Sequence, residues 1–318
     1  MINSLQPDQL VYDLERTLGC SGYILFFHGS FGDVYPNFAL LASFYEEHES
    51  HITVIVDQKY EGLCMRYQLP QVSYFIVESE DSFKRHVLGS RGGFKFRKGS
   101  VFSILPTLYP GWGELTLSYS LTDFQTKRLL LRLPLDAQFK WSGLDSVVYY
   151  AVRDRFDTLG LDEGRSVLLA PFTQSNSMLD LATIKLLATE IRGRCNLAVA
   201  VNIAGASDSD VAQITGSGLT CIKIVPEEMC ESISFFSLCI TSLSGFCFPL
   251  LMESHDCKIL IYSLLDNSNV NVGNHQVPDI RRQFGPDFPS SKSVTQILLH
   301  GATPMARVNE LIHNLSQL

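Results

Sequence analysis

Short apolar runs of strand character alternate with amphipathic helical patterns along this chain, and they do so in two successive sets. An apolar run of about five residues between turn-forming residues is typical of a strand that is buried on both faces. Such strands pair in parallel, and parallel pairing needs a crossover connection, which is usually a helix. The alternation therefore predicts an α/β fold with two doubly wound, Rossmann-like domains.

The first set begins with the run at 23–27, YILFF, which lies between two glycines. A helix is expected from Pro36 to about residue 50, because proline is favoured in a first turn and apolar residues recur at helical spacing from Phe38. The other elements expected here are strands at 52–56, 74–77 and 101–105 and helices at 119–132 and 144–158.

The second set follows a polar, glycine-punctuated segment at 160–165, GLDEGR, which is the expected linker. We therefore expect a first domain at 1–158, a second domain at 159–303 and an amphipathic C-terminal helix at 304–318. The expected strands are 166–170, 196–201, 220–224, 238–241 and 258–262, and the expected helices are 178–192, 208–215, 226–236 and 246–254.

Charge and cysteine content exclude several classes of protein. The formal charge is −8, from 25 basic and 33 acidic residues, so a chain-wide nucleic-acid surface is not expected. The eight cysteines form no C-x-x-C pair, which argues against a zinc ribbon and favours buried thiols in a reducing compartment. The N-terminus has no apolar stretch after a basic start, so we expect a cytoplasmic protein without a secretory signal.

The segment 232–252 carries no charged residue and has the length of a membrane span. Recurrent serines, Gly245 and Pro249 favour a soluble strand, turn and helix instead, because such breaks are costly in lipid.

Ligands of doubly wound sheets bind beyond the carboxyl ends of the strands, so the loops after Phe27, Ala170, Thr241 and Tyr262 are the places for a site. The first loop, HGSFGDV, lets the backbone approach a ligand, and its Asp33 fits either a helix cap or a general base. The second, PFTQSNS, suits an anion or a sugar, or else a solvated loop with a cap. The third, TSLSG, places small residues and hydroxyls ahead of a helix, as phosphate sites do, although a tight packing turn has the same composition.

Taken together, these loops resemble those of GT-B glycosyltransferases, and of the lipopolysaccharide heptosyltransferases that use ADP-heptose in particular. Gly32-Asp33-Val34 is similar to the family's Gly-Asp-Val element, and Leu243-Ser244-Gly245-Phe246 stands where the family has Asp-Ser-Gly-Pro. The order of elements is similar over most of the chain. The sequence departs from the family where Leu243 and Phe246 replace an acid and a proline, and where no lysine occurs between Phe172 and Leu179.

The resemblance implies an inverting, metal-independent glycosyltransferase that moves a hexosyl or heptosyl group from a nucleotide diphosphate to a glycan or glycolipid, as in polysaccharide biosynthesis. It needs no cofactor, and it makes Asp33 the catalytic base. The resemblance also implies that the two domains face a central cleft, that 1–158 is the acceptor domain and 159–303 the donor domain, and that the helix at 304–318 packs back toward the first domain. The expected donor site comprises Thr173, Gln174, Ser175, Glu228, Ser242, Ser244 and Gly245. The expected acceptor site comprises His28, Gly29, Ser30, Gly32, Arg91, Lys95, Arg97 and Lys98.

The four basic acceptor residues belong to a longer basic stretch at 82–113 that contains no acid. It reads either as a solvated face or as a loop for an anionic glycolipid, with peripheral contact at the inner face of the membrane. Asp208 and Asp210 have the spacing of a D-x-D metal motif, but they open an expected helix and are better assigned as caps. Two other functions stay open: a nucleotide-sugar epimerase and a non-catalytic sugar- or partner-binding module of the same fold.

Overall fold

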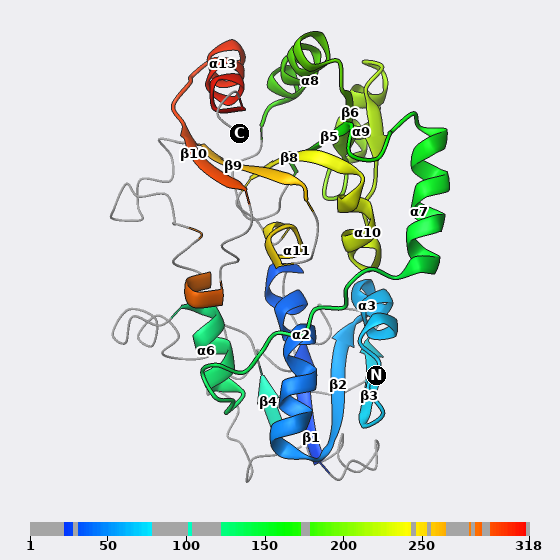
Figure 1. Ribbon diagram of the computed structural model, residues 1–318, viewed down its shortest axis with the longest axis vertical. Helices are drawn as coiled ribbons and strands as arrows, with labels where there is room; N and C mark the ends of the chain where they lie inside the picture. Colours follow the sequence, from blue (N-terminus) through cyan, green and yellow to red (C-terminus); the bar gives the residue numbers. More distant parts are fainter. Residues whose placement is uncertain are drawn as a thin grey trace. The chain divides into compact units, whose positions relative to one another are not determined.

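The computed structural model divides the chain into two compact units, Met1–Ser142 and Gly143–Leu318. Each unit contains one sheet in which every strand pair is parallel (Figure 1). This confirms the predicted class of two Rossmann-like α/β units, while a cleft between them stays a prediction. The structure describes residues 22–27, 31–77, 101–103, 122–172, 179–242, 246–252, 256–264, 280, 284–287 and 293–315.

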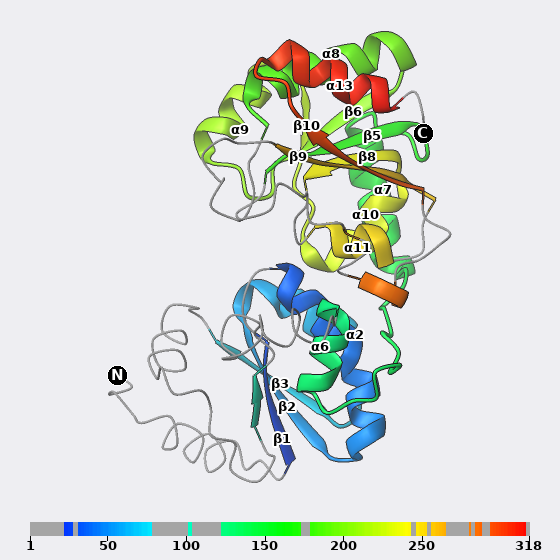
Figure 2. The same ribbon diagram turned by 90° about the vertical axis from the view of Figure 1, so that its left-hand side faces the viewer.

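The sheet of the first unit has the strand order β3-β2-β1-β4. The helix α2 follows β1 directly, and α6 lies beside α2 (Figure 2). The elements of this unit are β1 (Gly22–Phe27), α2 (Phe31–His48), β2 (His51–Asp57), η1 (Gln58–Tyr60), α3 (Glu61–Arg66), β3 (Val72–Val77), β4 (Val101–Ser103) and α6 (Asp123–Leu130).

Helix α2 begins five residues earlier than the sequence pattern predicts, at Phe31 rather than Pro36. Proline has no N–H, so Pro36 cannot donate to the carbonyl of Gly32 one turn before it. The helix tolerates that missing bond because it lies in the N-terminal part, and its face from Val34 onward is buried. Asp33 therefore belongs to the first turn of α2 instead of preceding the helix.

The second unit has a six-stranded sheet of order β10-β9-β8-β5-β6-β7. Counted from β5, this is the 3-2-1-4-5-6 order of the Rossmann fold, read from the opposite edge. Its elements are α7 (Ser146–Thr158), β5 (Ser166–Ala170), α8 (Leu181–Cys195), β6 (Ala198–Asn202), α9 (Asp208–Thr215), β7 (Thr220–Ile222), η3 (Pro226–Glu228), α10 (Met229–Ser234), β8 (Phe236–Ser242), α11 (Cys247–Met252), β9 (Lys258–Leu264), η5 (Gly285–Asp287), β10 (Val294–Leu299) and α13 (Pro304–Leu315).

Helices cover both faces of this sheet, as a doubly wound fold requires. Figures 1 and 2 show α8 and α13 on one face and α7, α10 and α11 on the other. On the first face, Val167 and Leu169 of β5 pack with Leu187 of α8 and Leu311 of α13 in one apolar cluster. Burial of this cluster on both helices is the main force that holds the layer together.

Helix α7 belongs to the second unit, so the boundary lies at 142/143 and not at the expected 158/159. Its buried Phe156 meets Phe235 edge-on, with ring centroids 5.2 Å apart, and the N–H of Asp145 donates to Glu231 at 2.7 Å. The polar segment 160–165 is a turn within this unit, because Gly160 and Gly164 both adopt φ of +68° and the N–H of Gly164 donates to the carbonyl of Phe235. Glycine punctuation there marks a tight turn and not a linker.

The C-terminal helix α13 packs on α8 within the second unit, while packing toward the first domain stays a prediction. Its buried residues Val308 and Leu311 join the core cluster under α8, and Arg307 forms an ion pair with Asp180 at the start of α8. The amphipathic pattern of this helix could be predicted from the sequence, whereas the partner of its apolar face could not.

We predict that Phe156→Ala lowers the free energy of unfolding of the second unit by about 3–5 kcal/mol, because truncating a fully buried phenylalanine leaves a cavity. Amide hydrogen exchange followed by mass spectrometry should show lost protection in β8 and unchanged protection in β2. Val147→Ala is the matched control on α7, since Val147 is 77% exposed and should leave both units within about 0.5 kcal/mol. Lost protection in β2 would contradict the assignment of α7.

Candidate functional site

The strand order of the second unit reverses between β5 and β8. The chain runs outward from β5 through β6 and β7 on one side, and from β8 through β9 and β10 on the other. The connections after β5 and β8 therefore diverge, which opens a crevice beyond their carboxyl ends where ligands of such sheets bind. The strands end side by side, with Ala170 opposite Thr241. The two loops predicted to bind the donor thus start at one point of the sheet edge.

Most of the predicted donor residues lie in these loops, outside the described residues. They are Thr173, Gln174, Ser175, Ser244 and Gly245. Their assignment stays a prediction. The structure describes the residues that precede and follow each loop.

Tyr262 of β9 lies beneath the first loop and touches both of its ends. Its hydroxyl donates to the carbonyl of Pro171 at 3.5 Å, just before the loop. The same hydroxyl lies beside the backbone of Leu179, just after the loop. Burial raises the pKa of Tyr262 above its ordinary range, and the nearby Leu179 backbone and Ser242 side chain lower it only in part. A neutral, buried hydroxyl therefore ties the two ends of the loop to the sheet.

Ser242 ends β8 and is the one predicted donor residue at this edge that the structure describes. Its side chain lies beside Tyr262, yet Oγ is buried and forms no hydrogen bond of normal geometry within the described residues. Its carbonyl accepts from the thiol of Cys247 at 3.3 Å, which closes the second loop onto the first turn of α11. A buried hydroxyl without a partner costs free energy unless a ligand or water supplies one.

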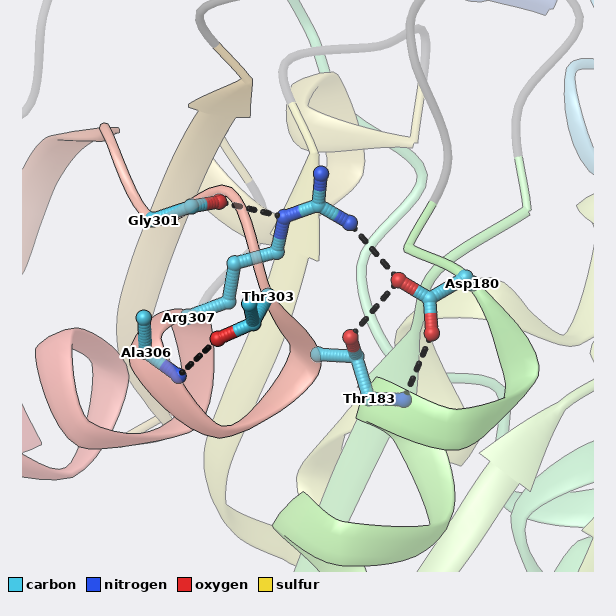
Figure 3. A network of polar contacts seen from close by, with 6 residues as sticks. All are labelled: Asp180, Thr183, Gly301, Thr303, Ala306 and Arg307. Carbon is cyan, nitrogen blue, oxygen red and sulfur yellow. Dashed lines mark hydrogen bonds and ion pairs between the residues drawn. The ribbon is translucent and has the colours of Figure 1, made fainter.

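The start of α8 carries a polar network that the sequence analysis did not assign (Figure 3). Asp180 caps the helix by accepting from the N–H and the hydroxyl of Thr183, both at 2.8 Å, and it pairs with Arg307 at 2.6 Å. Burial alone would raise the pKa of Asp180, but these hydrogen bonds and the charge of Arg307 outweigh it and lower that pKa. The carboxylate therefore stays ionised, and stability that depends on it is lost as the pH falls toward the folded-state pKa.

Glu228, predicted as a donor ligand, forms an ion pair, and its assignment to the donor site stays a prediction. Both of its carboxylate oxygens accept from the guanidinium of Arg155 on α7, at 3.1 and 2.8 Å. The pair joins η3 to α7, and this bidentate geometry gives Glu228 a structural partner within the unit.

In the first unit, Asp33 and Gly32 lie in the first turn of α2, at the carboxyl end of β1. This is the corresponding point of the smaller sheet, because the strand order also reverses between β1 and β4. Asn37 lies one turn further along α2. Asn37 is 1% exposed, and its Oδ1 accepts from the buried ammonium of Lys127 at 3.3 Å.

The other predicted acceptor residues lie outside the described residues. They are His28, Gly29, Ser30, Arg91, Lys95, Arg97 and Lys98.

Two further expectations concern caps and membrane spans. The Asp210 carboxylate accepts from the N–H and hydroxyl of Ser207, so Ser207 and Asp210 form a capping box at the start of α9, and Asp208 lies in the first turn of that helix. Segment 232–252 contains the end of α10, β8 and α11. Among the helices that the structure describes, none has both the length and the apolarity needed to cross a bilayer.

The fold is similar over nearly its whole length to solved glycosyltransferases. Heptosyltransferase II of E. coli, an ADP-heptose lipopolysaccharide enzyme, is 14% identical with a TM-score of 0.52, covering 93% of this chain and 99% of that one. A family 9 glycosyl transferase from Veillonella parvula is 12% identical, with a TM-score of 0.53 and coverage of 91% and 90%. The E. coli heptosyltransferase WaaC, solved with ADP, is 9% identical, with a TM-score of 0.55 and coverage of 93% and 99%.

This chain has the fold of these glycosyltransferases. The resemblance read from the loops is thereby confirmed at the level of fold. Scans of protein-family models and of curated protein sequences find no match.

The sequence analysis named the loop after Tyr262 as a place for a site but gave the Tyr262 side chain no role, and it missed Asp180 and Arg307 as residues of this edge. The sequence does contain an indication of the role of Tyr262, because this residue places a hydroxyl at the end of the aliphatic run at 259–261. The indication for Arg307 is weaker: it is a cation in the first turn of a helix, where the helix dipole disfavours positive charge.

We predict that stability falls as the pH rises above about 10, the ordinary pKa of tyrosine, because folding holds Tyr262 neutral. Each pH unit in that range should cost about 1.4 kcal/mol for Tyr262, and urea unfolding of Tyr262→Phe should show a shallower decline by that amount. The exposed Tyr150 gives the control, and Tyr150→Phe should follow the wild-type curve. Parallel curves for wild type and Tyr262→Phe would show that this hydroxyl is not held neutral.

Proposed function

We propose that this protein is an inverting, metal-independent glycosyltransferase that moves a sugar from a nucleotide diphosphate to a glycan or anionic glycolipid acceptor. The observation that carries the proposal is the strand reversal at β5 and β8, where two hydroxyl-rich loops leave one sheet edge. Helices α8 and α11 follow these loops, and helix N-termini bind phosphate without a metal. The similar solved structures are glycosyltransferases, and one of them holds ADP.

In this proposal the second unit binds the donor and the first binds the acceptor. Inversion requires one base to take a proton from the acceptor hydroxyl while donors hold the departing diphosphate. Asp33 is the proposed base, because it occupies the first turn of α2 at the point where the first sheet reverses its strand order. The basic stretch at 82–113 is the proposed contact with an anionic acceptor at the inner membrane face. Cytoplasmic location belongs to the same proposal.

We predict that Asp33→Asn lowers kcat by about 10²–10⁴-fold without loss of folding, the usual effect of removing a general base. Asparagine serves a helix start nearly as well as aspartate, so a purely structural Asp33 would tolerate this change. Asp57→Asn is the matched control, because Asp57 caps η1 at the carboxyl end of the neighbouring strand β2. Sugar release or transfer from a panel of nucleotide sugars provides the assay.

The outcomes separate the three functions. Wild-type turnover in a folded Asp33→Asn protein would remove the proposed base. Nucleotide-sugar affinity without turnover in the wild type would favour a binding module, and conversion of the donor to its epimer would favour an epimerase.

We also predict that Gly245→Val weakens donor binding, because a branched side chain blocks the approach of a diphosphate to the backbone of this loop. The donor KM should rise at least about tenfold, a loss comparable to one charge-assisted hydrogen bond, while the acceptor KM stays unchanged. Gly193→Val on α8 is the control for a glycine change in the same unit, since no atom lies within 4 Å of an added Cβ there. An unchanged donor KM would argue against the loop after β8 as the donor site.

A further inference from the structure

Arg307 extends from the first turn of α13 to the N-terminus of α8 (Figure 3). Its Nε donates to the carbonyl of Gly301 at 2.9 Å, and its Nη1 donates to Asp180 at 2.6 Å. These two bonds fix the plane of the guanidinium. Its remaining nitrogen, Nη2, makes no hydrogen bond within the part of the chain that the structure describes, and the side chain is 24% exposed.

The electrostatic balance around this guanidinium favours an anion. Strands β5 and β10 belong to one parallel sheet, so α8 and α13, which follow them, both begin at its carboxyl edge. Each helix N-terminus carries about half a positive charge, and Arg307 adds a full one. Asp180 is the carboxylate paired with it, while Glu310, one turn further along α13, accepts from the N–H of His300.

The same edge holds the two proposed donor loops. Leu179 and Asp180 end the first loop, and Leu179 lies beside the hydroxyl of Tyr262, which in turn lies beside Ser242. Ser242 is 1% exposed, and apart from its contact with Tyr262 its Oγ forms no hydrogen bond of normal geometry among the described residues. An unsatisfied buried hydroxyl is thus present at this edge in addition to the guanidinium.

The loops themselves bring no positive side chain to this edge. Residues 171–180 read PFTQSNSMLD and residues 243–246 read LSGF, with no lysine or arginine in either. A diphosphate in contact with them carries at least two negative charges, and buried or half-buried charges are stable only when they are paired.

We propose that Arg307 supplies the cation that binds the diphosphate of the nucleotide donor, although it comes from the C-terminal helix and not from the loops. The inference rests on the proposed function, since it names a residue of that donor site. Nη2 donates to a phosphate oxygen, while Gly301 and Asp180 hold the guanidinium in place. As the bond to the sugar breaks and charge collects on the diphosphate, the same contact stabilises the leaving group.

The test compares nucleoside diphosphates with nucleosides on the full chain. Calorimetric titration first finds which of ADP, GDP and UDP the wild type binds most tightly. Arg307→Gln should weaken binding of that diphosphate at least tenfold, as expected for loss of a charge-assisted hydrogen bond, and should leave binding of the parent nucleoside unchanged. Arg307→Lys should restore part of the affinity.

Two controls distinguish phosphate binding by Arg307 from a purely structural role, in which Arg307 only joins α13 to α8. Arg194→Gln removes an arginine that is paired with Glu190 in the last turn of α8, at the other end of that helix, and should not change diphosphate affinity. Asp180→Asn removes the competing negative charge but leaves an amide oxygen that can accept from Nη1 or cap α8, so it should strengthen diphosphate binding if Arg307 binds phosphate.

If Arg307 has only the structural role, Asp180→Asn and Arg307→Gln should both weaken the binding of nucleoside and of diphosphate to the same extent. That result would overturn the inference. Unchanged diphosphate affinity in a folded Arg307→Gln protein would overturn it as well, while leaving the proposed function standing. If the wild type binds none of the three diphosphates, the proposed function fails together with the inference.

Discussion

The pairing of β5 with β8 is the constraint on which the second unit depends. Every residue of β5 is buried, and hydroxyls from β8 reinforce the backbone ladder at both ends. Ser237 donates to the carbonyl of Ser166, and Thr241 donates to the carbonyl of Ala170, each at 3.2 Å. A slip of one residue would turn every side chain to the opposite face. This register decides which residues end the two strands, and therefore where the two hydroxyl-rich loops begin.

The edge above this pair combines groups from four parts of the chain. Backbone and hydroxyl groups come from the loops after β5 and β8, a buried phenol comes from β9, and a guanidinium comes from α13. Gly301 allows the last of these, because a Cβ there would lie 2.7 Å from the backbone nitrogen of Arg307. The carbonyl that holds the guanidinium can thus sit directly against the first turn of α13. The C-terminal helix serves both as cover for the core and as a source of charge.

The elements that could be predicted from the sequence are those whose position is determined by residues within or next to the element itself. The run SVLLA is a strand at its expected bounds because it is apolar throughout, and α9 begins where Ser207 and Asp210 form a capping box. Strand β10 was missed because its half-buried residues, VTQILL, mix polar and apolar side chains. The observed boundary differs from the expected 158/159 because Phe156 packs against Phe236 of β8, which is distant in sequence. The roles of Tyr262 and Arg307 could not be predicted for the same reason, since only the folded chain brings these residues to the loops.

The central claim is that the β5–β8 edge binds the diphosphate of a nucleotide donor. Hydrogen–deuterium exchange of the full chain, with and without a saturating nucleoside diphosphate, tests it most directly. The account predicts slower exchange in peptides that cover 171–183, 242–250 and 301–310, with β7 and α9 unchanged. Protection confined to the first unit, or absence of protection at the first two segments despite measured binding, would contradict it.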